Sequence, residues 1–158
     1  MDTIQKNKSN VTEAISKVGN ILGSTAAIPI SAGSYFLSVY YHNNQLKKVA
    51  LFTVGASMAQ SIVTIAVKKA FGRARPYQGE GPNSFFNNGS KDQSFYSGHS
   101  AEAFTLATVI SEIYKQDHPI VPWVSYGLAS LTAYARVHDQ QHWASDVIIG
   151  AVAGHLVT

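Results

Sequence analysis

Charged residues are absent from three long stretches of the chain, residues 18–46, 49–67 and 118–135. The stretch 49–67 is the best candidate for a membrane-spanning helix, because a span needs about 20 mainly apolar residues and this stretch has a lysine pair at each end. All three stretches are diluted with small polar residues, and the first is also broken by Pro29. The pattern therefore suits helices buried in a protein core as well as helices in lipid.

The stretch 49–67 carries a polar stripe at helical spacing. Its polar residues recur every three or four positions and are Thr53, Ser57, Gln60, Ser61, Thr64 and then Lys68. The opposite side is apolar and holds Leu51, Val54, Met58, Ile62 and Ile65. This periodicity predicts a helix whose polar stripe packs against other helices or lines a wet cleft, with Lys68 at the end of the stripe.

Three more helices and one long loop are predicted after this helix. Residues 71–95 are rich in Gly, Pro and Asn and predict a loop of functional length. Residues 99–115 have an amphipathic pattern. The next helix starts near two prolines that suit a first turn and runs to about Val137, and the last runs from near Gln141 through Ala151.

The pattern contains no long strand-like alternation and no internal repeat. We therefore expect an all-α chain that forms a single domain over residues 1–158. Within it, residues 1–48 are expected to form an N-terminal helical segment. Residues 49–157 are expected to form the core that carries the chemistry.

Composition narrows the class of protein. Charged residues make up 13% of the 158 residues, against about 25% in a typical soluble domain, which argues against a disordered tail or a coiled coil. The net charge of only +3 gives no reason to expect a nucleic-acid partner. Cysteine is absent, which excludes disulfides, thiolate metal sites and a cysteine nucleophile. The polar start resembles no signal peptide, and we expect a trimmed chain that also stops inside a helical pattern.

Three short segments hold the candidate chemistry. They are Lys68-x6-Arg75-Pro76, Ser97-Gly98-His99 and Arg136-x5-His142-x3-Asp146. Three cations brought together repel unless an anion lies between them, and guanidinium groups bind phosphate oxygens bidentately. Ser97 and Gly98 stand at a predicted helix start, where backbone N–H groups favour an anion. These residues together predict a phosphate site.

The third segment predicts a nucleophile. His142 and Asp146 are four residues apart, so on a continuous helix they share a face. A carboxylate there can hold one ring nitrogen of the imidazole and leave the other free to attack. His99 is then the candidate acid for the leaving oxygen. These groups and the cations together indicate phosphoryl transfer.

The three segments, in this order and spacing, resemble the signature of the type 2 phosphatidic acid phosphatase superfamily. That group includes bacterial class A acid phosphatases, lipid phosphate phosphatases and vanadium haloperoxidases. The resemblance implies a helical bundle of this type and a phosphatase that works through a phosphohistidine. It implies His142 as nucleophile, Asp146 as its orienting group and His99 as general acid. It also implies phosphate binding by Lys68, Arg75, Ser97, Gly98 and Arg136, with no metal or other cofactor and with vanadate binding as a phosphate analogue.

Two residues depart from the family pattern. Tyr96 stands where proline is usual before Ser97, and Ala135 stands where serine commonly precedes Arg136. Neither change removes a group from the expected chemistry. We expect Tyr96 to alter the rigidity of the loop or the fit of the substrate.

Three alternatives remain open. His138, His142 and Asp146 have metal-ligand spacing on a continuous helix, which predicts a metal hydrolase whose activity a chelator abolishes. A vanadate-dependent haloperoxidase would use His142 in the same pocket and oxidise bromide with peroxide. In a non-catalytic membrane bundle, the motifs would be degenerate remnants without a catalytic role.

The site chemistry defines the phosphoryl group and leaves the rest of the substrate open. Lipid phosphates and small phosphomonoesters both fit, and three loop aromatics, Tyr77, Phe85 and Phe86, could grip a chain or pack on the core. We favour an extracytoplasmic, periplasmic, soluble or peripheral domain, with an integral membrane lipid phosphatase as the second choice. The sequence makes no prediction of oligomeric state.

Overall fold

The computed structural model describes residues 10–24, 27–87 and 93–158. The described residues form six α-helices and no strand, which confirms the all-α prediction. The helices are α1 (Asn10–Ser24), α2 (Ala27–Tyr40), α3 (Asn44–Phe71), α4 (Gly98–Tyr114), α5 (Val121–His138) and α6 (Ala144–Val157). One turn of 3₁₀ helix, Pro76–Gln78, lies in the predicted loop after α3.

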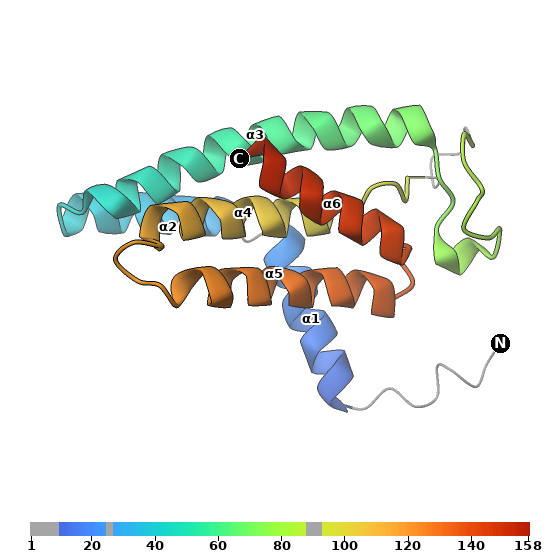
Figure 1. The fold of residues 1–158 in the computed structure, drawn as a ribbon, viewed down its shortest axis with the longest axis horizontal. Coiled ribbons are helices and arrows are strands. Elements are labelled where there is room, and N and C mark those ends of the chain that lie inside the picture. The colour runs from blue at the N-terminus through green and yellow to red at the C-terminus, as the bar shows by residue number, and fades with distance from the viewer. Residues whose placement is uncertain (1–9, 25–26, 88–92) are drawn as a thin grey trace.

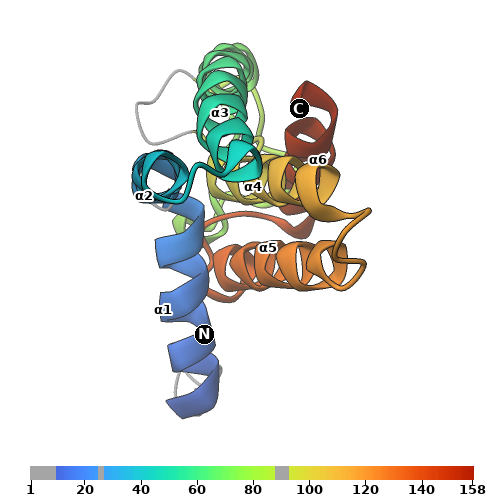
Figure 2. The ribbon, with the colours of Figure 1, turned by 90° about the vertical axis from the view of Figure 1, so that its left-hand side faces the viewer.

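The bundle is built around α4, which packs against α3, α5, α6 and α1. Helix α3 runs along one side of the bundle with α2 beside it, and α1 crosses α5 at a steep angle (Figures 1 and 2). The α4–α6 contact is close because α6 presents two glycines to α4. A Cβ atom built at Gly154 would lie 2.1 Å from the backbone oxygen of Ala101, and one at Gly150 would lie 2.6 Å from that of Ser97. These glycines therefore bring α6 against the start of α4.

Helix α3 is delimited by ordinary capping groups. The Asn43 side chain accepts hydrogen bonds from the N–H groups of Gln45 and Leu46, at 2.9 and 3.1 Å, which satisfies donors that the first turn leaves free. At the other end Gly72 adopts a left-handed conformation with φ 44° and donates to the Lys68 carbonyl at 3.1 Å. This conformation suits glycine, and the chain then leaves the helix toward the site.

The polar stripe of α3 faces the protein and its apolar side faces outward, as the periodicity predicts. Thr53 and Gln60 are each 1% exposed, whereas Met58 and Ile62 are 64% and 68% exposed. Among the described residues, α3 is the one helix long and apolar enough to cross a membrane. The molecule thus exposes a continuous apolar side, which is unusual for a soluble monomer.

One predicted boundary is wrong. The last helix begins at Ala144 and not near Gln141, because residues between α5 and α6 form a tight turn. Gln140 has φ 54° there, and the N–H groups of Gln141 and His142 both donate to the Arg136 carbonyl, at 3.1 and 3.2 Å. His142 therefore precedes α6, and the assumption that it shares one helix face with Asp146 is also wrong.

Candidate active site

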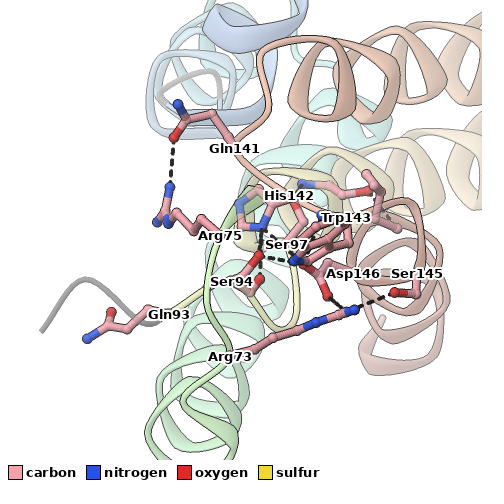
Figure 3. Close-up of polar contacts among 12 residues, drawn as sticks. Arg73, Arg75, Gln93, Ser94, Ser97, Gln141, His142, Trp143, Ser145 and Asp146 are labelled. Carbon is pink, nitrogen blue, oxygen red and sulfur yellow. Dashed lines mark hydrogen bonds and ion pairs between the residues drawn. The ribbon is translucent and has the colours of Figure 1, made fainter. Parts of the chain in front are cut away.

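The three predicted segments meet at one end of the bundle. The end of α3, the start of α4 and the turn between α5 and α6 lie together there (Figure 3). The Ser97 N–H donates to the Asp146 carbonyl at 3.0 Å, and Arg75 Nη1 donates to Gln141 Oε1 at 2.8 Å. Residues far apart in the chain are thus joined directly by hydrogen bonds.

The ring of His142 is held by the backbone of Ser94. Nδ1 lies 2.8 Å from the Ser94 carbonyl oxygen and 3.9 Å from Oδ2 of Asp146, and the residue is 2% exposed. Because a carbonyl can only accept, Nδ1 carries the proton and Nε2 carries the lone pair. Ser94 was not among the predicted site residues. The orienting role of Asp146 stays a prediction, and in this geometry it would act largely through Ser94.

Burial lowers the pKa of His142 to about 4. The nearby Asp146 carboxylate opposes this shift, and the positive charges of Lys68, Arg75 and Arg136 add to it. The ring is therefore neutral at neutral pH. A neutral imidazole with a free lone pair is the form that can attack phosphorus.

Asp146 is completely buried and accepts hydrogen bonds on both carboxylate oxygens. Oδ2 accepts from the Ser94 hydroxyl at 2.5 Å and from the Trp143 N–H at 3.0 Å, while Oδ1 accepts from Arg73. The Trp143 indole donates in turn to the Ala74 carbonyl at 2.9 Å. Hydrogen bonds from Arg73, Ser94 and Trp143 thus hold both oxygens of the carboxylate in place.

Arg73 is a site residue that the sequence analysis missed. Its guanidinium pairs with Asp146, donates to the Ser145 hydroxyl at 2.8 Å, and lies 4.7 Å from the ring centre of Phe85. The side chain is 6% exposed. The available signal was a second arginine inside the Lys68-x6-Arg75 interval. Its partner lies 73 positions away, so spacing alone could not identify the pair.

The predicted phosphate-binding cations, Lys68, Arg75 and Arg136, keep N–H donors that are available to a ligand. Lys68 Nζ donates to the Gln93 carbonyl, and Arg136 Nη1 donates to Asn20 Oδ1 at 2.7 Å. The buried Nε atoms of Arg75 and Arg136 have no hydrogen-bond partner in the part of the chain that the structure describes. An anion that accepted from these atoms would remove the cost of burying them unpaired.

The segment Ser97-Gly98-His99 forms the start of α4. The Ser97 side chain caps the helix by accepting from the Ser100 N–H at 3.3 Å. Burial lowers the pKa of His99 to about 4, and the positive charges of Arg136, Lys68 and Arg75 lower it further. Both histidines and the helix N-terminus therefore experience the same positive field, which favours an anion.

The two departures from the family pattern are both buried. The Tyr96 hydroxyl accepts from Gln60 Nε2 at 2.9 Å, so this residue ties the loop before α4 to the polar stripe of α3. Ala135 is 0% exposed. A Cβ atom built at Gly19 of α1 would lie 2.9 Å from the Cβ atom of Ala135. A small residue at 135 therefore suits the close crossing of α1 and α5.

The spacing behind the metal alternative does not occur. His138 ends α5 and its Nδ1 lies 3.1 Å from Asp139 Oδ1, while His142 follows the turn. Over residues 10–24, 27–87 and 93–158, no group of three His, Asp or Glu side chains is arranged to hold a metal ion.

Comparison with known proteins agrees with the motifs. The profile of the PAP2 superfamily matches residues 49–158. The chain is 38% identical over 92 residues to "Lipid A 1-phosphatase" of Porphyromonas gingivalis, a match that covers 58% of this chain and 18% of the relative. It is 30% identical over 168 residues to "Phospholipid phosphatase 1" of Rattus norvegicus, covering 87% of this chain and 59% of the relative. The chain thus spans less than two thirds of either relative.

Two solved structures share the fold. LpxE of Aquifex aeolicus has a TM-score of 0.70 at 22% identity, and the match covers 97% of this chain and 86% of that chain. The transmembrane PAP2 type phosphatidylglycerolphosphate phosphatase of Bacillus subtilis has a TM-score of 0.67 at 20% identity, covering 98% of this chain and 76% of that chain. The fold, the three segments and the profile match agree, and the chain belongs to the PAP2 superfamily.

Proposed function

We propose that this chain is a phosphatase that hydrolyses the phosphomonoester of a membrane lipid through a phosphohistidine. One observation carries the proposal. The neutral ring of His142 is held through Nδ1 by Ser94 beside three cations, two of which have buried Nε donors without partners among the described residues. This arrangement supplies a nucleophile and a receptor for phosphoryl oxygens at the same point.

In the first step, Nε2 of His142 attacks phosphorus and the bond from phosphorus to the lipid oxygen breaks. His99 gives its proton to the departing oxygen, so the lipid alcohol leaves neutral. Lys68, Arg75 and Arg136, with the hydroxyl of Ser97 and the N–H group of Gly98, hold the three remaining oxygens as charge develops. The products of this step are the alcohol and a phosphohistidine.

In the second step, water attacks phosphorus and the bond between phosphorus and Nε2 breaks. His99 takes a proton from the water, which restores its charged form, and inorganic phosphate is released. Asp146, held by Arg73 and by Ser94, stabilises the positive charge on His142 while the phosphoryl group is attached. No metal or other cofactor takes part in either step.

His99 needs a proton for the first step, although its pKa in the ligand-free site is about 4 because of burial and nearby positive charges. A bound phosphate ester brings negative charge among the same cations and raises this pKa. Binding of the substrate thereby favours the protonated form of His99, which the departure of the alcohol requires.

Three observations support a lipid substrate in a membrane. The outward side of α3 is apolar, both curated relatives bear the names of lipid phosphatases, and one fold relative is described as transmembrane. Of the loop aromatics, Phe85 packs against Phe71 and Phe95, while Tyr77 and Phe86 are exposed at 50% and 72%. We therefore propose that the bundle lies in the bilayer as an integral membrane phosphatase, in preference to a soluble domain.

The test is phosphate release by protein purified in detergent, from a lipid phosphate in mixed micelles and from a soluble phosphomonoester. His142→Ala should abolish release, whereas His118→Ala, at an exposed position after α4, should not. Equal release by wild type and His142→Ala would contradict the proposal. Wild type denatured in alkaline detergent during turnover of a substrate with labelled phosphate should also contain labelled phosphohistidine, because the phosphorus–nitrogen bond survives alkali and hydrolyses in acid.

The same preparation tests the two enzymatic alternatives. Release that survives a strong chelator excludes the metal hydrolase. Vanadate should inhibit release as a phosphate analogue, and bromide oxidation by the vanadate-loaded protein with peroxide would favour the haloperoxidase.

A further inference from the structure

An open groove leads from the site along the contact between α3 and α4. It has a volume of about 660 Å³, and Gly98 and His99 form the end next to the site. Its lining is mostly apolar and includes Val54, Met58, Ile62 and Ile65 of α3. The groove is therefore continuous with the place where the leaving oxygen of a substrate would lie, and it can take an apolar chain.

The wall of this groove also carries polar atoms. Gln60 lines the groove and is 1% exposed, and its Oε1 atom has no hydrogen-bond partner within the described residues. Its Nε2 atom donates to Tyr96 and to Thr64, at 2.9 and 3.1 Å. In this orientation the amide nitrogen donates to both hydroxyls, and the atom left unpaired is the carbonyl oxygen, an acceptor. A buried acceptor left without a donor costs about 1–3 kcal/mol.

A second acceptor lines the same groove. Glu102 lines the groove and follows His99 by three residues on α4, a rise of about 4.5 Å. The Ser57 hydroxyl donates to Oε1 of Glu102, which leaves Oε2 to accept from a ligand. The groove next to the site therefore offers acceptors, and a ligand with hydrogen-bond donors satisfies them.

We propose that this groove binds the leaving group of the substrate and selects lipid phosphates that carry a hydroxyl or amide N–H next to the phosphoester. The proposal rests on the proposed phosphatase function. The donor pairs with Glu102 and with Oε1 of Gln60, and one apolar chain lies along Met58 and Ile62. A diacylglycerol phosphate carries ester carbonyls there, which are acceptors only, and leaves the groove acceptors unpaired.

Matched substrates test the selection. One pair is 1-acylglycerol 3-phosphate and its 2-O-methyl ether, which differ only in the hydroxyl donor. A second pair is N-acylethanolamine phosphate and its N-methyl amide, which differ only in the N–H donor. We expect kcat/KM to be on the order of tenfold to a hundredfold higher for the donor in at least one pair, as for a hydrogen bond to a charged group. The pair that responds identifies the source of the donor.

Two variants on the same helix test the residue. Glu102→Leu removes the acceptor from an apolar groove without leaving a cavity, and Glu112→Leu removes an exposed carboxylate of α4 that pairs with Lys115. The preference should fall to about twofold or less in Glu102→Leu, because the hydrogen bond that provides it is lost. Each tenfold of lost preference corresponds to about 1.4 kcal/mol of lost transition-state stabilisation. Glu112→Leu should keep it. The melting temperature of each variant shows whether it is folded.

Equal kcat/KM within both pairs for the wild type would overturn the proposal and would indicate that bulk lipid fills the groove. An unchanged preference in folded Glu102→Leu would overturn it as well. Failure of the proposed function has a different signature, since no lipid phosphate would then be hydrolysed by the wild type above the level of His142→Ala.

Discussion

Arg73 and Asp146 form a buried ion pair beneath the predicted nucleophile. The two side chains are 6% and 0% exposed, and Asp146 also accepts from Ser94 and from the Trp143 N–H (Figure 3). One partner comes from the segment after α3 and the other from the first turn of α6. The pair therefore fixes the position of the turn that carries His142.

Arg73→Met should destabilise the protein strongly, because it leaves the Asp146 carboxylate buried without its cation. Breaking such a pair from one side costs about 3–5 kcal/mol. We expect a lower melting temperature in detergent and a large loss of phosphatase activity. Lys69→Met, an exposed cation near the end of α3, is the matched control and should behave like the wild type.

The double variant Arg73→Met with Asp146→Asn separates charge from shape. It removes both charges and keeps an oxygen that can accept from the Trp143 N–H, so part of the lost stability should return. Activity should stay low. A double variant no more stable than Arg73→Met would contradict the view that the unpaired carboxylate is the cause.

Ser94→Ala should lower kcat in a protein that remains folded. The backbone carbonyl that holds His142 remains, but the hydroxyl that donates to Asp146 at 2.5 Å is lost. We expect kcat to fall about tenfold, which corresponds to a loss of roughly 1.4 kcal/mol of transition-state stabilisation. Steady-state kinetics measure this, and KM should change little because Ser94 makes no predicted contact with phosphate.

Ser145→Ala is the control for this variant. Ser145 accepts from Arg73 at 2.8 Å and makes no hydrogen bond to the carboxylate of Asp146 within the described residues, and Arg73 keeps its bond to the Pro82 carbonyl. Equal losses of kcat in the two variants would argue against a link from Asp146 through Ser94 to His142.

The parts of this molecule that were predictable from sequence depend on local spacing. The stripe of α3 has helical periodicity over many residues, so both its polar and its apolar sides were identified correctly. The three segments stand out because their internal spacings are short and specific, and the structure brings them together at one end of the bundle (Figure 3). In both cases the signal is the spacing of residues within one segment, and it does not depend on which segments meet in the fold.

The parts that were not predictable depend on contacts between distant segments or on backbone geometry without a residue signal. Arg73 acquires its role from Asp146, 73 positions away. The α5–α6 turn was missed because Gln140 carries its positive φ, and glutamine is not a usual residue for that conformation. The spacing of His142 and Asp146 also fits a helix, so the wrong boundary was the simpler interpretation.

Gly19→Ala should weaken phosphate binding from a distance. A Cβ atom there would lie 2.7 Å from the Leu131 carbonyl oxygen, so α1 must move away from α5. Asn20, the next residue, accepts from Arg136 Nη1 at 2.7 Å, and this contact should be lost. We expect a higher inhibition constant for phosphate and a destabilisation of about 1–3 kcal/mol.

Gly33→Ala on α2 is the control, because a Cβ atom there meets nothing within 4 Å. That change should leave phosphate binding unaltered and stabilise the protein slightly, since alanine favours a helix over glycine. Equal phosphate inhibition in the two alanine variants would show that α1 does not position Arg136.

The absence of cysteine allows the expected extracytoplasmic location of the site to be tested by labelling. Tyr77→Cys lies in the loop at the site end, and Asn44→Cys lies at the opposite end of α3. In intact cells a membrane-impermeant maleimide should label the first variant. It should label the second only after the membrane is permeabilised, and the reverse result would place the site on the cytoplasmic side.

Sulfate binding should be accompanied by proton uptake near pH 6. The pKa of His99 in the ligand-free site is about 4, owing to burial and to neighbouring positive charges, so this ring is neutral at pH 6. Sulfate keeps its charge throughout this range, and its negative charge offsets the cations and raises the pKa of His99, so the ring takes up a proton. Titration calorimetry in buffers of different ionisation enthalpy measures the uptake. It should fall in His99→Asn and persist in His118→Asn, and an equal uptake in both variants would show that His99 is not the group that takes up the proton.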